Sequence, residues 1–122
     1  MNTEVRGLPD TVAGLDDPTS AVCLFRSLAD PARLRILQHL ALGEHRVVEL
    51  TAHVGLAQST VSAHLACLKD CGLVQSRPHG RASVFSLARR EVLDLLAAAE
   101  TLLAATGSAV ALCPTYGARG DR

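Results

Sequence analysis

The hydrophobic pattern changes its period in the middle of the chain, and this change most constrains the fold. Apolar residues first recur at helical spacing, at Val61, Leu65 and Leu68, which predicts an amphipathic helix. Residues 73–77 and 82–87 then have the pattern of two short strands. The sequence between them, Pro78-His79-Gly80-Arg81, is typical of a turn, because glycine tolerates a left-handed backbone. A helix followed directly by a β-hairpin is therefore expected.

Helix-start and helix-stop residues divide the rest of the chain. Asp17-Pro18 and Asp30-Pro31 each combine a capping carboxylate with a proline that suits the first helical turn. A short third helix is expected over residues 47–54, closed by Gly55. A last helix, over about residues 89–106, is apolar around more than half of its circumference. The order of elements predicts a mainly α fold with a small β-hairpin wing, which is a winged helix-turn-helix.

The chain is long enough for one domain only, with 122 residues. We expect a flexible N-terminal arm over residues 1–16, a DNA-binding and dimerisation domain over 17–107, and a C-terminal tail over 108–122. The last helix carries more apolar positions than one small core can hide, so together with the first helix it is expected to form a homodimer interface. Aromatic residues make up only 2% of the chain, so leucine, valine and alanine must build the core.

Acidic residues argue against a secretory leader or a membrane span. Glu4 and Asp10 interrupt the N-terminal stretch, and Asp94 and Glu100 interrupt the longest apolar stretch. We therefore expect a cytoplasmic protein that does not bind membranes. The four cysteines are then expected to be reduced thiols rather than disulfides.

Local charge and side-chain size indicate a nucleic-acid surface. The twelve basic and twelve acidic residues cancel overall, yet residues 56–90 hold five basic residues against one acidic residue. Opposite its apolar stripe, the helix around Val61 carries short side chains that would let its backbone approach base edges in a major groove. The candidate DNA contacts are Ser59, Thr60, Ser62, Ala63 and Lys69 on this helix, with Arg77 and Arg81 on the hairpin. A merely solvated surface is the alternative interpretation.

Two cysteines have the spacing of metal ligands. Cys67 and Cys71 are four residues apart, which places both thiols on one helix face with Cβ atoms about 5–6 Å apart. Two thiolates at this separation can converge on one soft ion.

Three separated motifs resemble the ArsR/SmtB family of metal-responsive repressors. Phe25-Arg26-Ser27-Leu28-Ala29-Asp30-Pro31-Ala32-Arg33-Leu34-Arg35-Ile36-Leu37 is similar to the opening motif of that family. Gln58-Ser59-Thr60-Val61-Ser62-Ala63-His64-Leu65 resembles its recognition helix, and Gly80-Arg81 with Val84-Phe85-Ser86-Leu87 resembles its wing. The resemblance implies a homodimeric repressor that binds double-stranded operator DNA when metal-free and releases it on binding an inducer. It adds Gln58 and His64 to the candidate DNA contacts.

The resemblance also implies where an inducer binds. A family site that needs a Cys-x-Cys pair is absent, because residues 47–50 contain no thiol, and the last helix lacks the histidines of another site. A pair of cysteines at the end of the recognition helix with a third in the tail is similar to the cadmium- and lead-sensing mycobacterial branch. This implies a metal site of Cys67, Cys71 and Cys113 for Cd(II) or Pb(II). Cys23 is expected to pack in the core or in the dimer interface.

Several alternatives remain open at this stage. As(III) and Zn(II) are rival inducers, and a thiol-redox switch on the same fold is a rival mechanism. A metal buffer or delivery protein without DNA binding is the alternative from another class. A thiol enzyme built on Cys67 and His64 lacks an activated nucleophile and a cofactor loop, so we expect no enzyme. His39, His45, His53 and His79 show no spacing that indicates a shared role.

Overall fold

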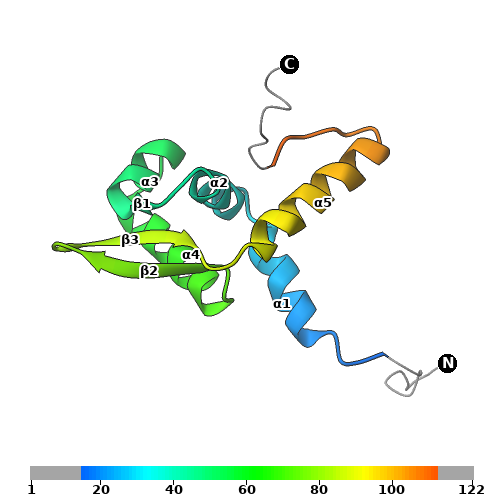
Figure 1. Cartoon of the computed structure of the whole chain (residues 1–122), viewed down its shortest axis with the longest axis horizontal. Coiled ribbons are helices and arrows are strands. Elements are labelled where there is room, and N and C mark those ends of the chain that lie inside the picture. Colours follow the sequence, from blue (N-terminus) through cyan, green and yellow to red (C-terminus); the bar gives the residue numbers. More distant parts are fainter. Residues whose placement is uncertain (1–14, 113–122) are drawn as a thin grey trace.

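The chain folds into five helices and a small three-stranded sheet in a computed structural model that describes residues 15–112 (Figure 1). In chain order the elements are α1 (Thr19–Leu28), α2 (Pro31–Leu40), β1 (His45–Arg46), α3 (Val47–Val54), α4 (Gln58–Asp70), β2 (Val74–His79), β3 (Ala82–Leu87) and α5 (Glu91–Ala105). This order confirms the predicted winged helix-turn-helix. Most of the predicted arm and all of the tail beyond Leu112 lie outside the described residues.

The two Asp-Pro pairs begin helices as predicted. Asp30 is the N-cap of α2, and its Oδ2 accepts a 3.0 Å hydrogen bond from the backbone N–H of Arg33. This bond favours the ionised carboxylate and lowers the pKa of Asp30, with the nearby His64 adding to the effect. At α1 the cap is Pro18, while Asp17 accepts bonds from the backbone N–H (3.0 Å) and hydroxyl (2.7 Å) of Thr19. Both starts therefore use a carboxylate to satisfy free helix N–H groups.

The turn between α3 and α4 depends on glycine. Gly55 ends α3 in a left-handed conformation with a φ of 71°, which glycine adopts without a Cβ clash. The chain then reaches the start of α4 within three residues. This is the turn of a helix-turn-helix, with α4 in the place of the recognition helix.

The sheet contains one strand that the sequence pattern did not predict. The strand order is β1-β3-β2, and both pairs are antiparallel. In the predicted hairpin, Val74 lies opposite Leu87 and His79 opposite Ala82, so Gly80 and Arg81 form the loop. The additional strand, β1, has only two residues, His45 and Arg46. Its pairing with Val84 and Phe85, in the middle of β3, ties the hairpin to the start of α3.

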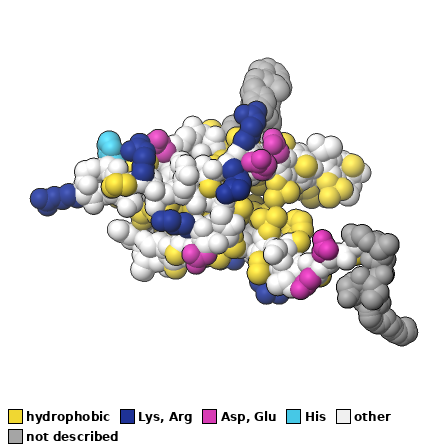
Figure 2. All heavy atoms as spheres, turned by 60° about the horizontal axis from the view of Figure 1, so that its bottom comes forward, with side chains coloured by type: hydrophobic (Ala, Val, Ile, Leu, Met, Phe, Trp, Pro, Cys, Tyr) yellow, Lys and Arg dark blue, Asp and Glu magenta, His cyan; other side chains and the backbone are white. Residues whose placement is uncertain are grey.

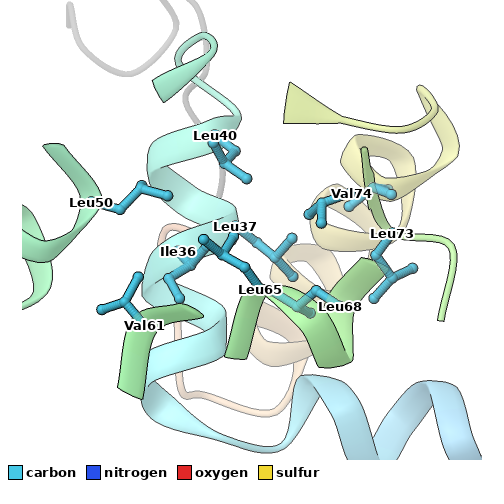
Figure 3. Close-up of a cluster of buried hydrophobic side chains, with 10 residues drawn as sticks. Ile36, Leu37, Leu40, Leu50, Val61, Leu65, Leu68, Leu73 and Val74 are labelled. Atoms are coloured by element: carbon cyan, nitrogen blue, oxygen red, sulfur yellow. The ribbon is translucent and has the colours of Figure 1, made fainter. Parts of the chain in front are cut away.

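One cluster of aliphatic side chains forms the core (Figure 3). Its members come from α2, α3, α4, the start of the hairpin and α5: Ile36, Leu37, Leu40, Leu50, Val61, Leu65, Leu68, Leu73, Val74 and Val92. The predicted stripe of α4 is fully buried in this cluster, with Val61, Leu65 and Leu68 at most 1% exposed. The opposite face of α4 is therefore the face that is free to meet a partner.

Helices α1 and α5 leave large apolar side chains exposed. Val22 and Phe25 on α1 are 44% and 59% exposed, and Leu102 on α5 is 65% exposed. Figure 2 shows hydrophobic side chains gathered at the end of the molecule that these two helices form. Within residues 15–112, no helix is long and apolar enough to span a membrane.

Candidate metal and DNA-binding sites

Cys67 and Cys71 lie together at the C-terminal end of α4. Cys67 is half-buried in the last turn of the helix, and Cys71 is its C-cap. Both sulfurs contact the same hydroxyl on α1, because Ser27 Oγ lies 2.9 Å from Cys71 Sγ and 3.8 Å from Cys67 Sγ. The two thiols thus converge on one point between α1 and α4, as the spacing of four residues suggested.

The two converging thiols fit a soft metal ion only in part. Thiolate sulfur is the ligand type that soft ions prefer, and two sulfurs near one atom are close enough to share an ion. In residues 15–112, however, no three His, Cys, Asp or Glu side chains are already arranged to hold a metal ion. A three-thiolate site therefore needs another sulfur or a movement of one that is present. Cys113, the predicted third ligand, lies outside the described residues.

Cys23 does not lie in the core, and that part of its predicted role is wrong. It is exposed on α1, and together with Asp70 and Cys71 it lines a cavity of about 340 Å³ between α1 and the end of α4. Cys23 lies on the same face of α1 as Ser27, one turn earlier, but every residue from Thr19 to Cys23 is exposed, so this turn of the helix is not covered by the core. A role of Cys23 in a dimer interface stays a prediction.

The exposed face of α4 carries the predicted base-reading residues. Side chains outside its buried stripe are exposed at Gln58, Ser59, Thr60, Ser62 and Ala63. Gln58 also lines a hollow of about 360 Å³ between the start of α3 and the hairpin, together with Arg81 and Arg46. Figure 2 shows basic side chains projecting at the hairpin end of the molecule. Arg46 was missed from sequence, since only the pairing of β1 with β3 brings it beside the wing.

Three other candidate DNA contacts have partners within the chain. His64 is half-buried against α2, with Nδ1 3.4 Å from Arg33 Nη1 and Nε2 3.8 Å from Asp30 Oδ2. Lys69 Nζ donates a 2.9 Å hydrogen bond to Ser76 Oγ on β2, and Arg77 forms an ion pair with Glu44. The position of His64 favours a role in packing α4 against α2. DNA contacts by these three residues stay predictions.

A cluster of three histidines joins α2, β1 and α3, although the sequence spacing indicated none. The ring of His39 is stacked on that of His53, with centroids 4.3 Å apart. The ring of His45 lies edge-on to both, at 6.2 Å from His39 and 5.5 Å from His53. Partial burial, followed by the charges of His53, His45 and Arg35, lowers the pKa of His39. The cluster forms only because the tertiary fold brings three separate elements together.

Comparison with known proteins agrees with this geometry. Residues 30–76 match the family model described as "Bacterial regulatory protein, arsR family". The chain is 37% identical over 105 residues to the probable mercury resistance operon repressor of Streptomyces lividans, covering 86% of this chain and 84% of that protein. A relative with this identity over most of both chains has the same fold and belongs to the same family.

Two solved structures extend the comparison. The homodimeric winged helix-turn-helix DNA-binding domain of a possible ArsR-family transcriptional regulator from Mycobacterium bovis has a TM-score of 0.68 and 30% identity, covering 78% of this chain and 93% of that one. The cadmium metal-sensor CMTR from Mycobacterium tuberculosis has a TM-score of 0.55 and 43% identity, covering 63% and 80%. The protein described here therefore belongs to the arsR family of bacterial regulatory proteins.

Proposed function

We propose that the protein is a homodimeric transcriptional repressor that binds operator DNA when metal-free and releases it when a soft metal ion binds. The proposed inducer is Cd(II) or Pb(II), and the proposed ligands are the thiolates of Cys67, Cys71 and Cys113. The observation that carries the proposal is the contact of both Cys67 and Cys71 with Ser27 Oγ. It gathers two soft ligands at one end of the helix whose other end faces the predicted DNA groove.

The DNA-binding half of the proposal rests on α4 and the wing. Small and polar side chains are exposed at the first turns of α4, while the hairpin carries Arg81 beside Gln58. Base edges would be read by the helix, and phosphates would be bound by the arginines. Arg46 joins this set because it lines the same hollow.

The dimer is supported by the exposed apolar side chains of α1 and α5 and by the homodimeric structure of the relative from M. bovis. In a dimer, the two α4 helices must match two half-sites about one turn of DNA apart. A metal ion that ties the end of α4 to the tail would change this spacing. A difference of about 1–3 kcal/mol between the two states is typical of such coupling.

A second candidate inducer is Hg(II). The relative from S. lividans is named as a probable mercury resistance repressor and covers most of this chain. Hg(II) is the softest of these ions and is commonly satisfied by two thiolates, which Cys67 and Cys71 already supply. The two candidates differ in their need for Cys113, so this cysteine separates them experimentally.

The test is DNA release by the full-length protein. A fluorescent duplex, selected from random sequence by the metal-free protein, is followed by anisotropy while Cd(II), Pb(II), Hg(II) or As(III) is added. Ultraviolet charge-transfer bands report thiolate binding in parallel. Cys67→Ser and Cys71→Ser should bind the duplex as the wild type does but should not release it. Ala66→Ser, an exposed substitution on the same helix, should respond normally.

Each other outcome has a definite meaning. Loss of the Cd(II) response in Cys113→Ser supports the three-thiolate site, whereas loss in Cys23→Ser would assign the third ligand to α1. A Hg(II) response that survives Cys113→Ser supports the two-thiolate alternative. Normal release from the Cys67 and Cys71 variants would refute the site. Metal binding without any DNA binding would identify a metal buffer instead of a repressor.

A further inference from the structure

The side chain of Ser27 is buried, and its hydroxyl contacts two sulfur atoms, those of Cys67 and Cys71. It is 4% exposed and is the single buried polar residue in the described part of the chain. Its Oγ lies 2.9 Å from Cys71 Sγ and 3.8 Å from Cys67 Sγ. A buried hydroxyl without a hydrogen-bond partner is destabilising, so the fold favours conformations in which Ser27 Oγ stays in contact with the two thiols.

The backbone of Ser27 is held from the opposite direction by α2. Arg33 Nε donates a 2.7 Å hydrogen bond to the carbonyl oxygen of Ser27. The backbone N–H of Arg33 is in turn bonded to Asp30, and its guanidinium lies 3.4 Å from His64 Nδ1. Ser27 therefore has little freedom to move away from the thiols.

One face of α4 meets this network along about two helical turns. His64, Cys67 and Cys71 are spaced three and four residues apart, which places them on the same face of the helix. His64 contacts Arg33 and Asp30 on α2, and the two cysteines contact Ser27 on α1. A displacement of the cysteines therefore acts directly on the end of α1. The same helix carries Val22 and Phe25, the exposed residues of the expected dimer interface.

We propose that Ser27 is a positioning residue of the thiol site, and that it transmits metal binding from α4 to α1. This inference rests on the proposed function. When metal–sulfur bonds form, each cysteine releases its thiol proton to solvent, and its sulfur can then only accept hydrogen bonds. The Ser27 hydroxyl has one proton, and it donates this proton to the nearer sulfur, that of Cys71. A hydrogen bond to an ionised sulfur is stronger than one to a thiol.

The sulfur of Cys67 is less restrained than that of Cys71. Cys67 Sγ, at 3.8 Å from the hydroxyl, is the weaker contact and is free to turn toward the ion. The hydroxyl thus holds the sulfur of Cys71 in the position where it would bind the ion. Because Ser27 belongs to the last turns of α1 and its Oγ is already in close contact with Cys71 Sγ, the strengthened bond makes the end of α1 follow any displacement of Cys71. The geometry of the dimer interface then depends on whether metal is bound.

The test compares Ser27→Ala with Ser27→Thr in the full-length protein. Cd(II) affinity is measured by chelator competition with the ultraviolet thiolate band as readout, and duplex affinity is measured with and without Cd(II). In Ser27→Ala we expect Cd(II) affinity to fall about tenfold, because a hydrogen bond to a charged sulfur is lost. The ratio of the two duplex affinities should fall with it, and metal-free duplex binding should be unchanged. Ser27→Thr, which keeps the hydroxyl, should restore both quantities.

The control is Ser20→Ala, an exposed serine on the same helix, which should match the wild type. Equal Cd(II) affinity and an equal duplex-affinity ratio in Ser27→Ala and wild type would overturn the proposal. So would a failure of Ser27→Thr to restore them while the thermal unfolding midpoint is normal. If the wild type itself is not released by any of the ions, the proposed function fails. If Cd(II) affinity still depends on the Ser27 hydroxyl in that case, Ser27 positions the thiols but does not transmit metal binding to DNA binding.

Discussion

The imidazole rings of His39 and His53 are stacked, with their planes inclined by 13° and their centroids 4.3 Å apart. His53 is exposed on α3, whereas His39 is half-buried on α2. The stacked pair is therefore part of the contact between α2 and α3, the first helix of the helix-turn-helix. Protonation of both rings would place two like charges in direct contact.

Stability should consequently fall in mild acid. The folded-state pKa of His39 is lowered, first by burial and then by the charges of His53, His45 and Arg35. The unfolded chain, with an ordinary histidine pKa of about 6.5, therefore takes up a proton more readily. The contribution of His39 is complete above that pH and is lost as the pH falls through it. Thermal unfolding midpoints measured from about pH 7.5 to about pH 5.5 should decline less steeply in His39→Gln than in the wild type. His79→Gln, on the hairpin, should keep the wild-type slope, and equal slopes in all three proteins would contradict the assignment.

Ser27→Cys should create a three-thiol site that does not need the tail. The substituted sulfur would replace an oxygen that already lies between Cys67 and Cys71. In a Cys113→Ser background, where we expect Cd(II) binding to be weakened, this change should restore a thiolate charge-transfer band of three-sulfur intensity. Ala21→Cys, at an exposed position of α1, provides the matched thiol and should restore nothing. A similar gain from both cysteines would show that proximity to Ser27 is irrelevant.

Arg81 and Arg77 should contribute unequally to DNA binding. Arg81 is exposed in the hairpin loop, whereas Arg77 is already paired with Glu44. Removal of one phosphate contact lowers the slope of log affinity against log salt by about 1. Arg81→Ala should show this loss in anisotropy titrations at several salt concentrations, and Arg77→Ala should show a smaller one. The reverse order would mean that Arg77 exchanges Glu44 for a phosphate on binding.

Phe25→Asp should weaken the dimer. Phe25 is 59% exposed on α1, and a buried charge in place of a ring at an apolar interface typically costs about 2 kcal/mol or more. Sedimentation velocity should therefore show a dimer dissociation constant raised at least about tenfold. Leu42→Asp removes a side chain that is 68% exposed after α2 and should leave the association state unchanged. A dimer dissociation constant of Phe25→Asp equal to that of the wild type would show that Phe25 lies outside the interface.

Asp30→Ala should destabilise the fold through the start of α2. Loss of a capping carboxylate costs about 1 kcal/mol in the free energy of unfolding, whereas asparagine keeps the capping oxygen. The hydrogen bond from Arg33 lowers the pKa of Asp30. The difference between wild type and Asp30→Ala should therefore shrink in urea unfolding as the pH falls below about 4, where the unfolded chain binds the proton first. Asp30→Asn should lie near the wild type at neutral pH, and a loss as large as that of alanine would rule out capping as the cause.

Most of the fold could be predicted because its signals are local. The Asp-Pro pairs, Gly55 and the stripe of Val61, Leu65 and Leu68 each act within a few residues, and the structure has the expected elements at those places. The two-residue strand β1 could not be predicted, because its only support is pairing with β3, about forty positions further along the chain. Arg46 was missed as a wing neighbour for the same reason.

The candidate site could be predicted only in part. The spacing of Cys67 and Cys71 placed both thiols on one helix face. The hydroxyl that they meet belongs to a residue forty positions earlier and carries no local signal. The outward position of Cys23 and the meeting of His39, His45 and His53 likewise depend on how whole helices pack. Short-range pattern cannot supply such relationships.

The buried stripe of α4 fixes the middle of this helix, so a movement at one end is coupled to an opposite movement at the other end. Its 13 residues make a rod about 20 Å long, and Leu65, near the middle, is fixed in the core as a fulcrum. A tilt of about 5° around that point moves the two ends about 1 Å in opposite directions, a distance comparable to the tolerance of a hydrogen bond. Contact with bases at one end of α4 and binding of an ion at the other end would then oppose each other, with only small shifts of the buried side chains of Val61 and Leu68.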